Sequence, residues 1–279
     1  MTATVEILLM WATVTAYALS AALFVVSIIF KQDTISRIAL GMTCAGVIPH
    51  VAAIVGRWVR IGHGPYIGFY EVVSSYALIG VVIFIALALA RKPFRAFGVA
   101  LMPMAFLALG GAMLASKTEV AITPNLASYW LVVHVAFAKL SYGSFITATG
   151  LAIVHILRLS RREVKGDGFF ASLTPESLDD LTAKFVSAGF VFLGIMIAAG
   201  AIWANEAWGR YWAWDPIETW SLVSWLVYAV VLHLRRTMGW VGKRFAWITI
   251  AALPVLLFAL IGVVIVYESI HGAYLLIGG

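Results

Sequence analysis

Eight stretches of about 20 apolar residues follow one another along the chain, and they constrain its fold more than any other feature. A helix of about 20 residues is long enough to cross the hydrocarbon layer of a bilayer. The chain is 63% hydrophobic and only 11% charged, whereas an ordinary soluble domain is about 25% charged. So much apolar surface cannot all face one buried core. The sequence therefore excludes a soluble fold and predicts an all-α, polytopic integral membrane protein with one membrane domain over residues 1–279.

The predicted membrane spans have soft boundaries, because the apolar runs fade gradually into the loops. We place them near residues 5–30, 37–58, 69–90, 96–115, 127–158, 183–205, 220–234 and 246–267. The first span has no basic segment before it, so it is expected to be a retained helix rather than a signal peptide. The connection of residues 160–182 has soluble character, and Thr174–Pro175 within it predicts a short interfacial helix that leads into the sixth span.

Lysine and arginine are distributed unevenly between the two sides of these spans. Fourteen fall on one side, namely Lys31, Arg37, Arg91, Lys92, Arg95, Arg158, Arg161, Arg162, Lys165, Lys184, Arg235, Arg236, Lys243 and Arg244, and four fall on the other, namely Arg57, Arg60, Lys117 and Arg210. Because basic residues gather on the cytoplasmic side, both termini and the loops near residues 60, 120 and 210 are expected outside the cytoplasm. The predicted location is the cell inner (plasma) membrane, with these loops facing the periplasm or outer side.

The net charge of +6 is explained by these short basic loops, so nucleic-acid binding is not expected. Cys44 is the single cysteine of the chain. One cysteine cannot form an internal disulfide, a cysteine-rich metal site or the Cys-x-x-Cys-His segment that carries c-type haem. Any haem bound by this chain would therefore be held without a covalent bond.

A tryptophan-rich outer connection, WANEAWGRYWAWDPIETWSLVSW from Trp203 to Trp225, is the strongest signal in the sequence. It holds six of the eleven tryptophans. Ordinary helix ends carry about one or two such residues in an aromatic belt at the lipid headgroups. The density of rings over residues 203–220 instead favours a platform for a flat apolar ligand, because aromatic faces stack on an extended ring system and exclude water from it.

The run Trp208–Gly209–x–Tyr211–Trp212–x–Trp214–Asp215–Pro216 resembles the WWD signature of a haem-handling protein family. Its members include the CcsA/ResC-type cytochrome c biogenesis proteins, which are subunits of cytochrome c synthases. Further segments that resemble the family are Arg57–Trp58, Gly62–His63–x–Pro65, Tyr70–Glu71, Ser128–Tyr129–Trp130, His134, Ser141–Tyr142–Gly143 and Ile270–His271–Gly272. The chain departs from the family at Ile217, where members commonly carry lysine, and at Gly68, where they commonly carry asparagine.

The resemblance implies non-covalent haem b as the cofactor, and histidines are common axial ligands of haem iron. It implies that His134 and His271 form the axial pair of a haem at the outer face. The residues expected around that haem are Trp208, Tyr211, Trp212, Trp214 and Asp215. It also implies His233, roughly 20 Å deeper than Trp220 along a helix, as the ligand of a second haem within the membrane. An interfacial histidine beside Arg235 is the alternative.

The other histidines are weaker candidate ligands. His155 lies about 31 Å along the fifth span from His134, so one haem cannot contact both, and a structural role is favoured. His63, in the first outer loop, could gate or briefly ligate haem, and a surface position is the alternative. His50, in the second span, is expected to form a hydrogen bond between helices.

Three charged side chains are expected to have structural roles. Asp215 and Glu218 are expected to organise the tryptophan-rich loop by capping the seventh span and accepting indole hydrogen bonds. Lys139 is an isolated cation in the fifth span, where it is expected to snorkel or to pair with Glu71.

The function implied by the resemblance is haem transport and presentation for covalent attachment to apocytochrome c, as a subunit of a cytochrome c synthase of the haem lyase type. The implied partners are a second membrane subunit of the ResB/CcsB type, apocytochrome c and the lipid bilayer. No nucleophile is visible in this chain, so the chemistry would belong to haem and the cysteines of apocytochrome c. One alternative is a haem-b membrane redox subunit that passes quinol electrons to a periplasmic cytochrome c partner. A regulatory or assembly scaffold without haem turnover is another.

Overall fold

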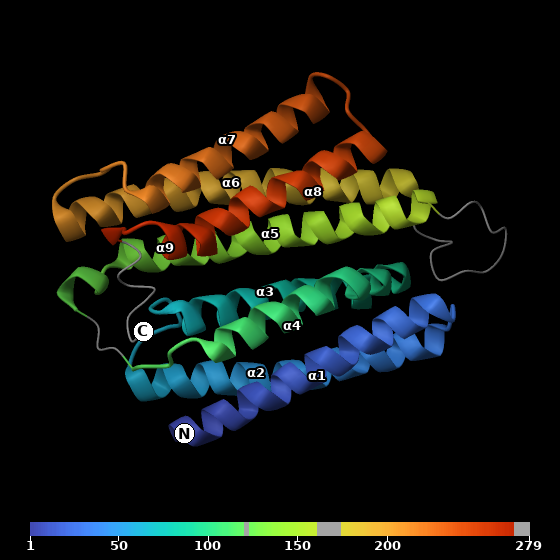
Figure 1. The fold of residues 1–279 in the computed structure, drawn as a ribbon, viewed down its shortest axis with the longest axis horizontal. Helices are drawn as coiled ribbons and strands as arrows, with labels where there is room; N and C mark the ends of the chain where they lie inside the picture. The colour runs from blue at the N-terminus through green and yellow to red at the C-terminus, as the bar shows by residue number, and fades with distance from the viewer. Residues whose placement is uncertain (120–122, 161–173, 271–279) are drawn as a thin grey trace.

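The computed structural model describes residues 1–119, 123–160 and 174–270, in which helices alternate with short connections and no strand occurs (Figure 1). The long helices are α1 (Ala3–Ile29), α2 (Asp33–Ile61), α3 (Phe69–Ala90), α4 (Gly98–Leu114), α5 (Tyr129–Ser160), α6 (Pro175–Trp208), α7 (Pro216–Arg236) and α8 (Lys243–Leu257). Short 3-10 helices, η1 (Lys92–Phe97) and η2 (Pro124–Leu126), precede α4 and α5. In these ranges eight helical segments are long and apolar enough to cross a membrane. The predicted fold class is confirmed.

The last span changes its helical form before it ends. α8 continues through a π-helical turn, η3 (Phe258–Gly262), into the short α9 (Val263–Val266). A π turn is rare and occurs mostly as a single turn inside an α-helix, frequently at functional sites. Here Ala259 and Leu260 of this turn line the cavity described below.

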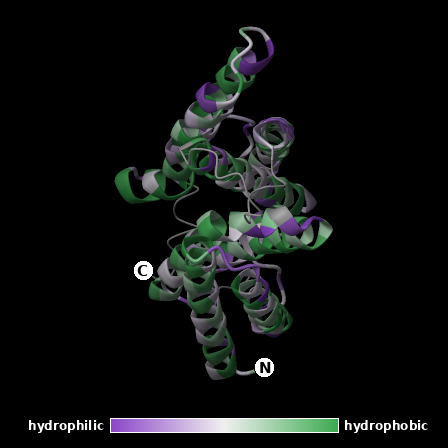
Figure 2. Cartoon of the chain, turned by 90° about the vertical axis from the view of Figure 1, so that its right-hand side faces the viewer, coloured by the Kyte–Doolittle hydropathy of each residue, from purple (hydrophilic) through white to green (hydrophobic). Residues whose placement is uncertain are grey.

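The helices form two halves that pack side by side (Figure 1). α1 to α4 make one half and α5 to α8 the other, and α3 packs against α5 between them. The connections α2–α3, α4–α5 and α6–α7 lie together at one end of the bundle, which we call the Trp-loop end because it carries residues 209–215. Much of the ribbon is coloured hydrophobic (Figure 2). Large apolar side chains such as Leu8, Ile48 and Val59 are exposed, as expected for helices that face lipid.

Each half has its own hydrophobic core. Tyr17, Phe24 and Phe84 are fully buried in the first half. In the second half the rings of Phe145 on α5 and Tyr228 on α7 stack with their centroids 3.5 Å apart. A third, smaller cluster lies at the Trp-loop end around Ile67, Leu126, Leu131 and Trp203. The Trp-loop end is therefore packed by its own apolar side chains.

The start of α6 agrees with the sequence prediction, but its length does not. The hydroxyl of Thr174 accepts a hydrogen bond from the Ser177 amide at 3.1 Å, and Pro175 occupies the first helical position. The separate interfacial helix expected before the sixth span is wrong, because α6 continues unbroken for 34 residues. No proline or glycine occurs between Pro175 and Gly189, so nothing interrupts the helical hydrogen bonds at the expected junction.

Candidate functional site

A cavity at the Trp-loop end lies between the two halves of the bundle. α3, α5, α6, α7 and η3 contribute to its walls, and a water-sized sphere has a cavity volume of about 160 Å³ to move in. Ligand pockets are lined mainly by apolar and aromatic groups. The aromatic residues that line this one are Tyr66, Tyr76, Tyr142, Trp203, Tyr211 and Trp212. Its lining suits a flat, mostly apolar ligand.

His134 on α5 is the histidine that lines this cavity among the described residues. Its Nδ1–H donates to the carbonyl of Met196 on α6 at 2.8 Å, and its ring lies 6.3 Å from that of Trp203. Because a carbonyl can only accept, this bond fixes the tautomer in which Nε2 carries the lone pair. That is the form of imidazole that binds a metal.

Gly200 on α6 makes the position of His134 possible. A Cβ atom at residue 200 would lie 2.6 Å from Nδ1 and 2.9 Å from Cε1 of His134. Both distances are shorter than real Cβ contacts, so any larger residue would displace the imidazole. The glycine therefore allows α5 and α6 to approach closely at His134.

The loop between α6 and α7 is shaped by its backbone and by two carboxylates. α6 ends at Gly209, which has φ +73, and Trp214 also adopts a left-handed φ of +58. Asp215 caps α7 by accepting from the Ile217 amide at 3.0 Å, and Glu218 accepts from the Ala213 amide at 2.8 Å. The predicted capping roles of Asp215 and Glu218 are confirmed, and these hydrogen bonds join them to backbone amides rather than to indoles.

Asp215 also ties the end of the described chain to this loop. Its Oδ2 atom accepts a hydrogen bond from the Ile270 amide at 2.8 Å, and the side chain is buried. His271, the expected second iron ligand, lies outside the described residues. Its neighbour Ile270 is thus held at the Trp-loop end.

The tryptophans of the loop differ in their orientation towards the cavity. Trp212 lines it together with Tyr211, whereas Trp208 and Trp214 do not. The ring of Trp208 packs against Trp203, 4.9 Å between centroids, and Trp214 is 69% exposed. The structure thus brings Tyr211 and Trp212 to the cavity, while Trp214, whose backbone is left-handed, lies with its side chain outwards.

Sequence reasoning missed several tyrosines of the cavity. Tyr142 lies eight residues after His134, with Ala138 midway between them, so the three share one face of α5. Tyr66 comes from the loop before α3. Burial raises the pKa of the Tyr66 phenol, and the nearby Glu71 carboxylate raises that pKa further. The phenol therefore stays protonated and can donate a hydrogen bond into the cavity.

Three other histidines, His50, His155 and His233, do not line the cavity. His50 is fully buried, with Nδ1 3.1 Å from the hydroxyl of Tyr17 on α1, which is the interhelical bond that the sequence favoured. His155 is buried near the far end of α5. His233 is exposed near the far end of α7. Only 17% of the apolar 18-residue stretch of α7 is buried, a smaller share than in the other seven described helical segments that could span a membrane.

The expectations for His63 and Lys139 need correction because the loop of residues 62–68 packs onto the bundle. His63 is 2% exposed rather than at the surface, and its Nδ1 donates to the Gly64 carbonyl at 2.8 Å. Lys139 neither snorkels nor pairs with Glu71. Its ammonium group donates to the carbonyl of Pro65 at 2.7 Å, while Glu71 is bound by Arg57.

The part of the chain that matches a known protein family includes the residues that line this cavity. Residues 66–271 match the family model described as "Cytochrome C assembly protein". The chain belongs to this family. It is 35% identical over 248 residues to cytochrome c biogenesis protein CcsA of Prochlorococcus marinus, with 78% of each chain covered. It is 32% identical over 267 residues to CcsA of Guillardia theta, with 88% of each chain covered.

A solved structure extends the likeness to the fold. Cytochrome c Heme Lyase CcmF superposes with a TM-score of 0.67 at 17% sequence identity. The match covers 93% of this chain and 47% of that chain. This chain and the heme lyase thus share an arrangement of helices. All described residues that line the cavity lie within the family match of residues 66–271.

Proposed function

We propose that this protein acts in cytochrome c maturation by holding haem b without a covalent bond and presenting it to apocytochrome c, as a subunit of a cytochrome c synthase. The observation that carries the proposal is His134, an imidazole with a fixed tautomer in a cavity lined by aromatic side chains. The names of the relatives, a cytochrome c biogenesis protein and a heme lyase, support it.

The residues present fit a haem. A porphyrin supplies four ligands to its own iron, so one or two protein imidazoles complete the coordination. His134 would be one, and we propose His271 as the other, because Asp215 holds the preceding residue at the Trp-loop end. Six aromatic side chains offer faces for a flat ring, and Glu218 and Ser221 give the lining a polar part.

Each residue of the site has a definable task in this reaction. His134, oriented by the Met196 carbonyl, would hold the iron and fix the plane of the ligand. Trp212 and Tyr211 would stack on it and exclude water. When bound, haem would supply vinyl groups, across which the two S–H bonds of apocytochrome c add to give two thioethers. The chain's own contribution is therefore orientation and a ligand that the histidine of apocytochrome c can replace.

We further propose that the Trp-loop end faces the outer side of the membrane, as the fourteen-to-four distribution of basic residues indicates. His233 is the candidate ligand of a second haem at the opposite end, because it is exposed on α7. His155 is a weaker candidate because it is buried. The uncovered face of α7 also leaves room for a second membrane subunit of the ResB/CcsB type.

The deciding experiment tests whether haem leaves the protein. The chain is co-expressed with its partner subunit and an apocytochrome c in a host that lacks its own maturation system. We expect covalent haem c on the cytochrome, detected by haem staining after denaturing electrophoresis, and none with His134→Ala. If no covalent product forms and the purified protein keeps stoichiometric haem that quinol reduces rapidly, the alternative of a haem-b redox subunit replaces this proposal.

The loop tryptophans allow a second, matched comparison. Trp212→Ala removes a ring from the cavity wall, and stacked aromatic contacts contribute about 0.5–1.5 kcal/mol beyond burial. Haem content after purification should therefore fall several-fold, while the remaining haem stays low-spin because no iron ligand is lost. Trp214→Ala is the control, since that side chain is 69% exposed. Equal haem content in the two variants would contradict a stacking role for Trp212.

A further inference from the structure

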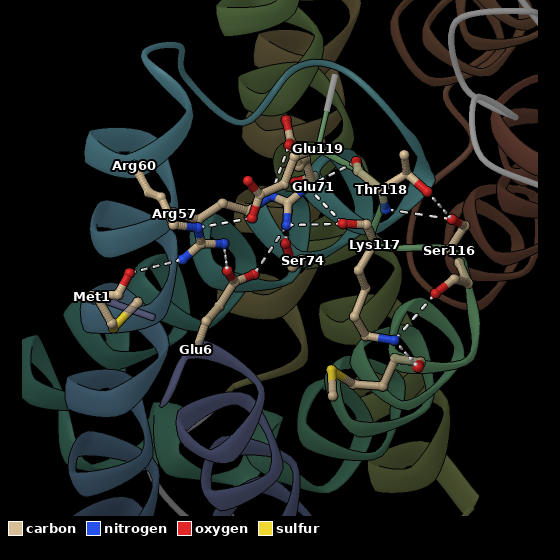
Figure 3. A network of polar contacts seen from close by, with 12 residues as sticks. Met1, Glu6, Arg57, Arg60, Glu71, Ser74, Ser116, Lys117, Thr118 and Glu119 are labelled. Carbon is tan, nitrogen blue, oxygen red and sulfur yellow. Dashed lines mark hydrogen bonds and ion pairs between the residues drawn. The ribbon is translucent and has the colours of Figure 1, made fainter. Parts of the chain in front are cut away.

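A buried network of charges lies at the Trp-loop end, outside the cavity (Figure 3). Its centre is Arg57 on α2, whose Nε atom donates to Glu71 on α3 at 2.8 Å and whose Nη1 atom donates to Glu6 on α1 at 3.3 Å. The same guanidinium donates to the carbonyls of Lys117 at 3.3 Å and Thr118 at 3.2 Å. The three charged side chains are between 2% and 6% exposed.

Stability alone does not account for this network. Removing an ion from water costs several kcal/mol, and apolar side chains of similar volume are often equally stabilising. Each charged side chain of the network nevertheless has an oppositely charged partner, because Arg60 also pairs with Glu6, and with Glu119 at 2.8 Å. Charges that are buried and oriented in this way hold neighbouring groups in fixed positions.

The network also holds a backbone amide of the cavity wall, that of Ile67. The second oxygen of Glu71, Oε2, accepts a hydrogen bond from the backbone amide of Ile67 at 3.3 Å. Ile67 and Tyr66 both line the cavity. The carbonyl of Pro65 receives Lys139 at 2.7 Å from the other side. The segment of residues 65–67 is thus fixed by a carboxylate on one side and an ammonium group on the other.

We propose that Arg57 is a positioning residue for the cavity. It orients Glu71, which fixes Ile67 and, with it, the Tyr66 side of the wall. The inference deepens the proposed function, because it concerns the same cavity. It also gives a role to α1 and α2, which precede residue 66, where the family match begins.

The test measures how fast a thiol at residue 67 of the cavity wall is labelled when no ligand is added. Ile67→Cys is introduced with Cys44→Ala, so that residue 67 carries the one thiol of the chain. Ile67 is 3% exposed, so a membrane-permeant maleimide should label Ile67→Cys slowly. Arg57→Lys should accelerate labelling at least about tenfold, because the donors of a lysine share one nitrogen and cannot span Glu71, Glu6 and two carbonyls.

Glu6→Gln is the matched control. Glu6 contacts Arg57 and Arg60, but two residues, Arg57 and Glu71, separate it from Ile67. The Arg57–Glu71 bond joins two other side chains and does not include Glu6. Labelling should stay within about twofold even where thermal stability falls. The proposal is overturned if Arg57→Lys leaves the rate unchanged in a folded protein, or if Glu6→Gln accelerates labelling equally.

Glu71→Gln is a second variant that keeps the proposal testable if Arg57→Lys does not fold. Arg57 retains Glu6, and Glu71 accepts with both oxygens, from Arg57 through Oε1 and from the Ile67 amide through Oε2. A glutamine has one acceptor oxygen and cannot keep both bonds. Labelling should again accelerate, and an unchanged rate would contradict the proposal. Haem content is a separate readout: a wild-type protein that binds no haem would overturn the proposed function and leave the labelling rates as they are.

Discussion

His134→Gly should remove at least about nine-tenths of the low-spin haem from the purified protein, because outer-shell changes alone cost metal sites about 10–100-fold. Glycine leaves a space shaped like the lost imidazole between α5 and α6. Imidazole added at millimolar concentration should enter that space and restore part of the low-spin spectrum. The measurement is the Soret and α-band absorption per protein, before and after imidazole. His271→Gly should behave in the same way if it supplies the second ligand.

A matched control separates ligation from packing. His50→Gly removes another buried histidine, one whose Nδ1 is paired with Tyr17 in the first half of the bundle. It should lower thermal stability and leave haem content unchanged. Full low-spin haem in both the His134 and the His271 variants would rule out this axial pair.

Gly200→Ala should cause a loss of low-spin haem comparable to that of His134→Gly, although it adds only a methyl group. The new Cβ would lie 2.6 Å from His134 Nδ1, so the ring must move and its bond to the Met196 carbonyl must break. Alanine favours helices over glycine by about 1 kcal/mol, and a weakened helix therefore cannot explain the loss. Haem content and thermal stability are measured on the same preparation.

The two variants should differ in their response to imidazole. In Gly200→Ala the displaced side chain still fills the space, so added imidazole should restore nothing. Gly194→Ala, six residues earlier on α6, is the control, because its Cβ would approach Trp225 Nε1 at 3.2 Å rather than a cavity residue. Normal haem in Gly200→Ala would show that His134 does not need its present position.

Most of the fold could be predicted because a membrane span is defined by composition and length. All eight predicted spans overlap the observed helices, and the capping residues Thr174 and Asp215 lie where their sequence neighbours indicated. The ends were less predictable. α6 begins eight residues before the expected span. A capped helix can begin in polar surroundings and continue into the membrane when no residue interrupts it.

Long-range pairing is what the sequence could not provide. Arg57 is 51 residues from Glu6 and 14 from Glu71, and no local pattern links them. Lys139 reaches a backbone carbonyl 74 residues away, an acceptor that every residue possesses. The directions of Trp208, Trp212 and Trp214 depend on a left-handed backbone at a non-glycine residue, which residue type does not predict.

The π turn at residues 258–262 makes the length of the last span as constrained as its composition. A turn with i→i+5 hydrogen bonds holds one residue more than an α-helical turn, so the bulge takes up one extra residue while the helix on either side keeps its phase. Deleting one residue here would relax the wide turn into ordinary helix and remove the widened backbone that brings Ala259 and Leu260 to the cavity. The same deletion in the regular part of α8 would turn everything beyond it by about 100°, and the Ile270 amide would then face away from Asp215, to which it now donates. Substitutions can accumulate along this span through evolution, whereas a single-codon deletion would either remove the bulge or detach Ile270 from the loop that it meets.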